Sequence, residues 1–113
     1  MIGKGKMYVI VNTELNMSTG KTAAQVAHAV ARLDVGVPKT MIVLGGTTEQ
    51  IHNLESYLDY MSIPNHKYID EGVNEVLPMT ATALAFGMVA DDYTPDYIQG
   101  FKLLGERKKW WQR

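Results

Sequence analysis

The fold prediction depends most on the stretch MYVIVNTELNMSTGKTAAQVAHAV, residues 7–30. Its first part, Met7–Asn12, is an apolar run rich in β-branched residues, which predicts a strand covered on both faces. Thr13–Gly20 reads as a loop. Lys21–Asp34 has helical character, and a glycine and a proline follow it. The stretch therefore predicts a strand, a loop and a helix that opens with the lysine of Gly-Lys-Thr.

This lysine raises the question of a phosphate-binding loop. The pattern G-x-x-x-x-G-K-[ST] requires a glycine at position 15, five residues before Gly20, but the chain has Leu15 there. The missing glycine would let the backbone N–H groups converge on a phosphate, and a residue with a Cβ resists that turn. The sequence thus argues against a nucleotide-triphosphate site, and a nucleotide-binding protein stays the least favoured hypothesis.

The rest of the chain continues the alternation of strands and helices. A second buried strand, stopped by Gly45-Gly46, precedes a capping box of Thr47 and Gln50 and a helix with one apolar face. Two more strands and a last helix, capped by Asp92 or Thr94, are expected after it. In chain order the expected elements are strand Lys39–Leu44, a helix bearing Ile51, Leu54, Leu58 and Met61, strand His66–Asp70, strand Thr80–Met88, and a helix from about Pro95 to Arg107.

These elements predict an α/β fold, a three-layer α/β/α arrangement with a four-stranded mixed sheet. The β-helix-β passages are expected to be right-handed crossovers that place helices on the sheet. The third and fourth strands are joined by a short link and are expected to pair antiparallel. A chain of 113 residues makes one domain, with a core over about 7–90 and a C-terminal helix and basic, aromatic tail over 95–113.

Composition narrows the function classes. The net charge of -1 does not indicate a strongly basic nucleic-acid binder. The absence of cysteine excludes disulfides and cysteine-based zinc sites. No apolar run approaches the ~20 residues of a membrane span, and the N-terminus lacks a signal-peptide pattern. His28, His52 and His66 lie on different elements, which argues against a three-histidine zinc site. We expect a cytoplasmic protein with no metal, cofactor or membrane.

The first helix has two chemically different faces. On a helical wheel a polar stripe, Lys21, Gln25, His28 and Arg32, falls within a narrow arc. Opposite it cluster Ala23, Val26, Ala27 and Val30. We expect the Ala/Val face to pack on the sheet and the polar stripe to face outward, either as an ordinary solvated face or as part of a functional site. The small alanines also permit close approach of a second subunit.

Two motifs in the same order resemble a known family. G-K-T-A-A-Q-V-A-H-A (Gly20–Ala29) is similar to the G-K-x-A-A-Q-x-x-H-A signature of type-2 peptidyl-tRNA hydrolases. Y-I-D-E-G-V-N-E-V-L-P-M-T-A-T-A-L-A-F-G (Tyr68–Gly87) is similar to the family's D-x-G-x-T-x-x-x-P-G-S-x-T-x-L-x-x-G block. The similarity runs from about Met7 to Met88, and two motifs in register make it more specific than either one alone.

The resemblance implies a four-stranded mixed sheet between helices, usually in a homodimer, and cleavage of the ester that joins a peptide to the ribose of tRNA. By position, Lys21 and Asp70 match the family's catalytic lysine and aspartate, and Thr82 matches the second of its two active-site threonines. Gln25 and His28 match helix residues that line the same cleft. No cofactor is implied.

The chain departs from the family pattern at two places. Asn74 stands where the family has its first active-site threonine, and Pro78-Met79-Thr80 stands where it has Pro-Gly-Ser. Asn74 still offers hydrogen bonds for positioning a water, whereas Met79 suggests a changed backbone or a filled pocket. These departures favour an alternative, in which a catalytically weakened family member acts as an RNA- or protein-binding module.

Ester hydrolysis needs an activated water, a stabilised oxyanion and a proton for the leaving ribose oxygen. We expect Asp70 to pair with Lys21 and to accept the proton of a water positioned by Asn74 or Thr82. Lys21, near the positive helix N-terminus, would stabilise the oxyanion. The alternative for Asp70 is a carboxylate that only caps a turn at Gly72.

Binding of a tRNA end would rest mainly on basic side chains that contact phosphates. Arg32 and Thr80 are candidates for substrate binding, and Lys4 and Lys6 extend a basic rim. The tail KKWWQR, residues 108–113, offers two tryptophans that either stack on an unpaired base or pack against the body or a partner subunit.

Overall fold

The computed structural model describes residues 4–70 and 80–105. Its five strands form one mixed sheet in the order β3-β4-β1-β2-β5. The strands are β1 (Lys6–Asn12), β2 (Thr40–Gly46), β3 (Asn65–Asp70), β4 (Thr80–Val89) and β5 (Lys102–Leu103). β1 and β2 run parallel, and the other neighbouring pairs, including β3 with β4 as expected, are antiparallel. The predicted α/β class and mixed sheet are confirmed, but the predicted number of four strands is wrong.

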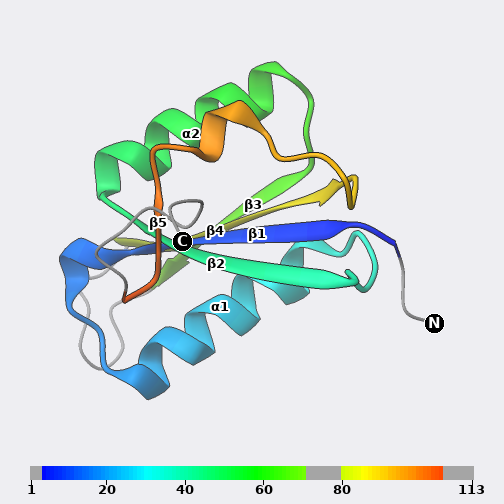
Figure 1. Cartoon of the computed structure of the whole chain (residues 1–113). Helices are drawn as coiled ribbons and strands as arrows, with labels where there is room; N and C mark the ends of the chain where they lie inside the picture. Colours follow the sequence, from blue (N-terminus) through cyan, green and yellow to red (C-terminus); the bar gives the residue numbers. More distant parts are fainter. Residues whose placement is uncertain (1–3, 71–79, 106–113) are drawn as a thin grey trace.

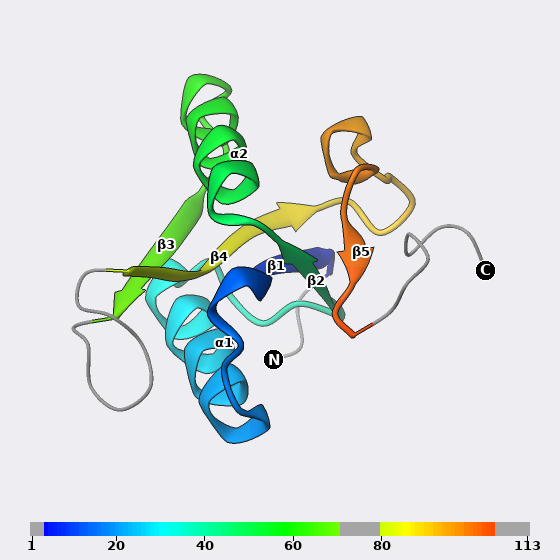
Figure 2. The ribbon, with the colours of Figure 1, turned by 90° about the vertical axis from the view of Figure 1, so that its left-hand side faces the viewer.

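Two helices cover the sheet from opposite sides. α1 (Thr19–Leu33) lies on one face and α2 (Thr48–Tyr60) on the other (Figure 1). Two short 3₁₀ turns, η1 (Thr13–Leu15) and η2 (Asp96–Ile98), lie in the connections. Figure 2 shows β3 and β5 at the two edges of the sheet, far from each other. In residues 4–70 and 80–105, neither helix has the length and apolar character needed to cross a bilayer.

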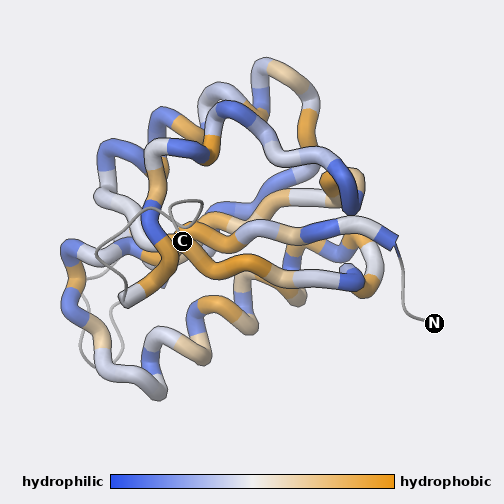
Figure 3. The backbone as a smooth tube through the Cα atoms, viewed as in Figure 1, coloured by the Kyte–Doolittle hydropathy of each residue, from blue (hydrophilic) through white to orange (hydrophobic). Residues whose placement is uncertain are grey.

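β1 lies at the centre because both of its faces are apolar. Tyr8 and Ile10 point to the α2 side, where they join a cluster of large side chains that includes Leu58. Val9, between them in sequence, points to the α1 side and packs with Ala29. Alternate residues of a strand face opposite sides of the sheet, so a continuous apolar run fits this position. Figure 3 shows the hydrophobic segments gathered along the central strands between the helices.

The start of α2 confirms the predicted capping box. Thr47 Oγ1 accepts a hydrogen bond from Gln50 N at 3.1 Å, and Gln50 Oε1 accepts one from Thr47 N at 2.9 Å. These bonds satisfy backbone donors that the first helical turn would otherwise leave unpaired. The apolar face of the helix then buries Ile51, Leu54 and Leu58 against the sheet.

The prediction that Gly45-Gly46 stops the second strand is wrong. β2 continues through both glycines, which pair with Val11 and Asn12 of β1. A Cβ on Gly46 would come within 2.9 Å of Ile10 Cγ2 and of Phe101 Cε1. The glycine therefore makes room for side chains that cross the end of the strand, rather than turning the chain.

The predicted helix from Pro95 to Arg107 is also wrong. The one helical element in its described part is the short turn η2, whose N-cap is Pro95 and makes no side-chain capping bond, so neither Asp92 nor Thr94 caps a helix. The chain then forms β5, in which Leu103 pairs with Leu44 of β2. Gly100 disfavours a helix at this point, and the edge of β2 supplies the backbone partners instead.

Asn12, at the C-terminal end of the central strand β1, connects that strand with η1, α2 and β4. Its Nδ2 donates to Thr48 Oγ1 at 2.8 Å and to the Ala81 carbonyl at 2.9 Å, and its Oδ1 accepts from Glu14 N at 3.0 Å. Glu14 Oε1 in turn accepts from Thr48 N at 2.8 Å, and this backbone hydrogen bond lowers the pKa of Glu14. The buried amide thus fixes η1, α2 and β4 relative to β1.

We expect Asn12→Ala to lower the free energy of unfolding by about 2 kcal/mol, because it removes a buried donor and leaves its partners unsatisfied. Urea denaturation of the purified variant measures this. The control is Asn53→Ala, an exposed asparagine on α2, for which a change within about 0.5 kcal/mol is expected. Equal stability of Asn12→Ala and wild type would contradict the bracing role of Asn12.

Candidate active site

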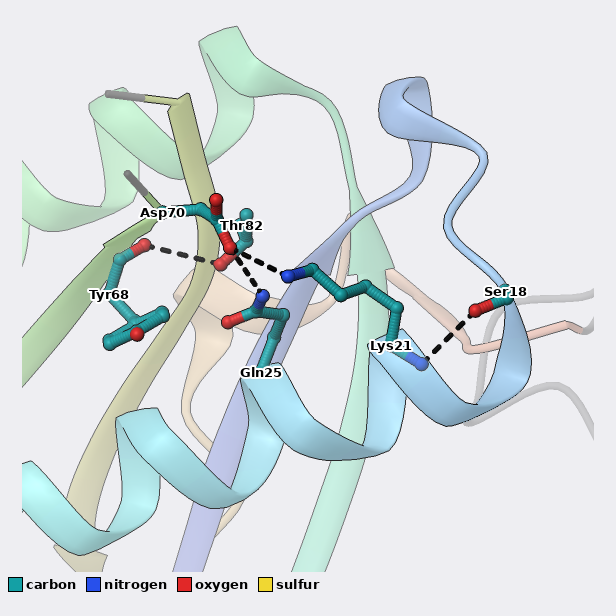
Figure 4. A network of polar contacts seen from close by, with 6 residues as sticks. All are labelled: Ser18, Lys21, Gln25, Tyr68, Asp70 and Thr82. Carbon is teal, nitrogen blue, oxygen red and sulfur yellow. Dashed lines mark hydrogen bonds and ion pairs between the residues drawn. The ribbon is translucent and has the colours of Figure 1, made fainter. Parts of the chain in front are cut away.

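Lys21 lies in the first turn of α1. Ser18 is the N-cap of the helix, and its Oγ accepts a hydrogen bond from Lys21 N at 3.2 Å (Figure 4). A serine cap satisfies one of the free N–H groups of the first turn and sets where the helix begins. The Lys21 side chain then runs toward β3, and its Nζ lies 2.9 Å from Asp70 Oδ2.

Asp70 ends β3 and is 4% exposed. The same oxygen that meets Lys21, Oδ2, also accepts a hydrogen bond from Gln25 Nε2 at 2.8 Å. Helix α1 therefore holds this oxygen with a cation and an amide. The expected meeting of Lys21 with Asp70 is thus what the structure shows. A buried carboxylate needs such partners because removal from water disfavours its charge.

The expected orientation of α1 is only partly right. Within the polar stripe, Gln25 faces the sheet and is 2% exposed, while His28 and Arg32 remain exposed. Val26 and Val30 are half-buried as expected, whereas Ala23 and Ala27 are exposed. The reason is that the ion pair and the amide contact turn the helix toward the edge strand. The hypothesis of an ordinary solvated stripe does not hold for Gln25.

His28 and Arg32 extend the site along the same seam, onto Tyr68 of β3. The His28 and Tyr68 rings stack with centroids 4.8 Å apart and an interplanar angle of 16°. Arg32 Cζ lies 4.9 Å from the centroid of the Tyr68 ring. Sequence reasoning missed Tyr68. Its signal was its place two residues before Asp70 in a strand, which brings it near the same helix.

The two threonines lie on β4, beside the end of β3. Thr82 is fully buried, and its Oγ1 donates to the Tyr68 carbonyl at 3.4 Å. Thr80 pairs with Asp70 in the register of the two strands. Asn74 and Met79 lie outside the described residues, as do Gly72 and the tail at 108–113, so the expectations placed on them stay predictions.

Gln25 Oε1 is a buried acceptor at the site, and in the described part of the chain no group donates a hydrogen bond to it. The amide must turn its nitrogen to the Asp70 carboxylate, because an oxygen there would be repelled, and this leaves the oxygen as an acceptor beside the ion pair. Unsatisfied buried polar atoms are rare, and a catalytic role is one of the explanations for them.

Residues 4–70 and 80–105 contain no cluster of side chains that could bind a metal ion. No three side chains of His, Cys, Asp or Glu gather there at distances suited to a metal ion. His28 belongs to the seam between α1 and β3, while His52 lies on α2, where its Nδ1 is 3.5 Å from Lys67 Nζ. What the arrangement offers is a cation, a carboxylate and an amide oxygen within one buried group.

The peptidyl-tRNA hydrolase PTH2 family model matches residues 5–104. The chain belongs to this family. Relatives of the same name align with most of it. The peptidyl-tRNA hydrolase of Thermoplasma volcanium is 30% identical over 115 residues, covering 88% of this chain and 97% of its own. The enzyme of Metallosphaera sedula is 28% identical, covering 88% and 99%, and that of Thermococcus sibiricus is 28% identical, covering 89% and 98%. The predicted family resemblance is confirmed.

Gln25→Glu tests the buried group in this family member, since it places a second carboxylate against Asp70. Two carboxylates at hydrogen-bond distance cannot both ionise easily, so the pair takes up a proton and its pKa rises. A raised pKa in the folded state means that the folded protein binds more protons than the unfolded chain, so stability falls as the pH rises. We therefore expect the variant to lose stability relative to wild type between about pH 5 and pH 7, measured by urea denaturation.

The matched control is Gln50→Glu, an exposed position in the capping box of α2, where a glutamate is a normal residue. Its stability should follow the wild type across the same pH range. A Gln25→Glu curve parallel to wild type would mean that the two side chains do not meet.

Proposed function

We propose that the Lys21–Asp70 pair is the catalytic centre of this peptidyl-tRNA hydrolase, an enzyme that cleaves the ester bond of peptidyl-tRNA and releases peptide and free tRNA. The observation that carries the proposal is the 2.9 Å contact between an ammonium at a helix N-terminus and a carboxylate that is itself held by Gln25. A cation and a base in one group are what ester hydrolysis by water requires.

The reaction follows from these groups. A water adds to the carbonyl carbon of the ester while Asp70 accepts one of its protons. The negative charge that develops on the carbonyl oxygen is stabilised by the Lys21 ammonium and by the positive end of α1. The tetrahedral intermediate then breaks its bond to the ribose oxygen, and the proton held by Asp70 passes to that oxygen. Peptide and tRNA leave, and the pair is restored.

Neighbouring side chains position the water and the substrate in this proposal. Gln25 Oε1 is a buried acceptor beside the pair and takes the second hydrogen of the water. Thr82 supports the strand that carries Asp70, through its bond to the Tyr68 carbonyl. Substrate contact is assigned to Thr80, which pairs with Asp70 in the strand register, and to His28, which stacks on Tyr68. Asn74 shares the water-positioning role by its place in the family motif.

The alternatives are weaker. The name shared by the family model and the relatives is that of the hydrolase, and nothing in these matches supports a catalytically weakened binding module. A phosphate-binding loop would direct Lys21 to a nucleotide, whereas its Nζ is engaged by Asp70. We further propose that the protein binds tRNA and works in translation in the cytoplasm, where peptidyl-tRNA arises.

We expect Lys21→Ala and Asp70→Ala each to slow the release of tRNA from an N-blocked aminoacyl-tRNA about 100-fold or more. The measurement is single-turnover release of free tRNA, with folding checked by circular dichroism. A matched control is the ion pair Lys67 Nζ–Glu55 Oε1, also at 2.9 Å. Lys67→Ala and Glu55→Ala should retain the wild-type rate. Equal losses in both pairs, or full activity of Lys21→Ala, would refute the assignment.

We also propose that two copies associate through the exposed side of α1. Ala23 and Ala27, spaced four residues apart, face outward and permit close approach of a second helix. Beside them lies an apolar hollow of about 930 Å³, bordered by Met41 and Leu104, which are 42% and 37% exposed. A surface that is complementary to itself suits a two-fold dimer.

Ala27→Glu should convert such a dimer to a monomer, because it places a charge at the centre of the apolar contact. Sedimentation velocity at micromolar concentration measures the mass. The control is Ala24→Glu, an exposed alanine of the same helix that does not border the hollow. The proposal falls if wild type sediments as a monomer, or if both variants behave alike.

A further inference from the structure

Arg32 differs from the two paired lysines of the described residues. Lys21 and Lys67 each meet a carboxylate at 2.9 Å, and Arg32 takes part in neither of these ion pairs. Its guanidinium instead packs over the Tyr68 ring, with Cζ 4.9 Å from the centroid. The ring attracts the cation through its quadrupole but carries no negative charge that would neutralise it.

His28, Arg32 and Tyr68 form one cluster of side chains between α1 and β3. Arg32 Nη1 lies 3.5 Å from His28 Nδ1, and the His28 ring stacks on Tyr68. Arg32 therefore contacts both an imidazole and a phenol ring, and it stays an exposed residue on the last turn of α1. A guanidinium has five N–H donors, so those that do not approach His28 remain available to another ligand.

The position of Arg32 relative to the Lys21–Asp70 pair suggests which ligand it binds. Arg32 follows Lys21 by eleven residues on the same stripe, about 16 Å along the helix axis. Tyr68 precedes Asp70 on β3, so the seam between α1 and β3 connects the cluster with the pair. In the proposed function, the ester at the pair is attached to an RNA strand, and that strand carries a phosphate at every nucleotide. Planar guanidinium groups match phosphate oxygens with two parallel hydrogen bonds.

We propose that Arg32 forms a phosphate-binding subsite for the RNA strand that leads to the ester, and that Tyr68 is the positioning residue that holds it. The inference rests on the proposed function for the identity of the strand. The subsite places one phosphate a few nucleotides from the scissile bond. Because the cation is held in place before the RNA arrives, little side-chain freedom is lost on binding.

The test separates binding from cleavage. Binding of deacylated tRNA is measured by fluorescence anisotropy from 50 to 300 mM salt, for wild type, Arg32→Gln and Lys102→Gln. Lys102 is an exposed lysine on β5, at the opposite edge of the sheet, and it matches the charge change. Arg32→Gln should reduce the slope of log K against log[salt] by about 0.7–0.9, the value of one phosphate contact, and Lys102→Gln should leave it unchanged.

Kinetics with an N-blocked aminoacyl-tRNA give the second measurement. Arg32→Gln should raise KM several-fold and leave kcat near wild type, because the contact is made equally in the bound substrate and in the transition state. Tyr68→Leu should act in the same direction through Arg32, and the double variant should lose no more than Arg32→Gln alone. Tyr68→Phe keeps the ring and should behave as wild type.

An unchanged salt slope in Arg32→Gln overturns the subsite, even if wild type cleaves the ester. Equal slopes in Arg32→Gln and Lys102→Gln overturn it too, since the charge alone would then decide. If Arg32 only stabilised the C-terminal end of α1, the variant would melt at a lower temperature with wild-type tRNA binding. A wild-type protein that cleaves nothing, but whose tRNA binding loses slope by the predicted amount in Arg32→Gln, would refute the proposed function and keep the subsite.

Discussion

A carboxylate buried at the end of a strand requires partners, and in this protein helix α1 supplies two of them. Asp70 receives the ammonium of Lys21 and the amide of Gln25 on one oxygen. Taking charges out of water costs free energy that their mutual attraction often does not fully return, so a buried ion pair is weak evidence for stability. In the proposed mechanism, the arrangement holds a cation and a base in place before a substrate arrives, which lowers the reorganisation that the reaction needs.

The two faces of the sheet have different roles: one stabilises the fold, and the other carries the Lys21–Asp70 pair. The α2 side packs large side chains, among them Tyr8, Leu58 and Phe86, which bury much apolar surface and stabilise the fold. The α1 side has small residues at its centre, with Ala29 against Ala83 and Ala85. Small residues let the helix approach the sheet closely, so that side chains of α1 reach β3 directly. The polar seam thus exists because the core beneath α1 is thin.

Much of the fold could be read from local pattern. The run Met7–Asn12 has apolar residues on both faces, and the Thr47–Gln50 box uses only backbone and side-chain groups within one turn. Such signals do not depend on distant partners. The last helix was predicted wrongly because its region has no decisive local signal, and the free edge of β2 recruited Leu103 into the sheet. Likewise Gly45-Gly46 was taken as a stop, although Phe101, more than fifty residues away, explains the need for a glycine at Gly46.

The site, like the fold, could be predicted from the sequence only in part. The motif residues Lys21, Gln25 and Asp70 could be named from the sequence, because a family resemblance is carried by residue types at fixed spacing. The rotation of α1 could not, because a helical wheel gives the order of faces but not which face meets the sheet. The class of fold, the family and the charged pair follow from residue types and their spacing. Packing alone makes Gln25 buried, turns Ala23 and Ala27 outward and brings Arg32 onto Tyr68. These depend on the competition between apolar burial and charge pairing across elements distant in the chain, and that competition is settled when they pack.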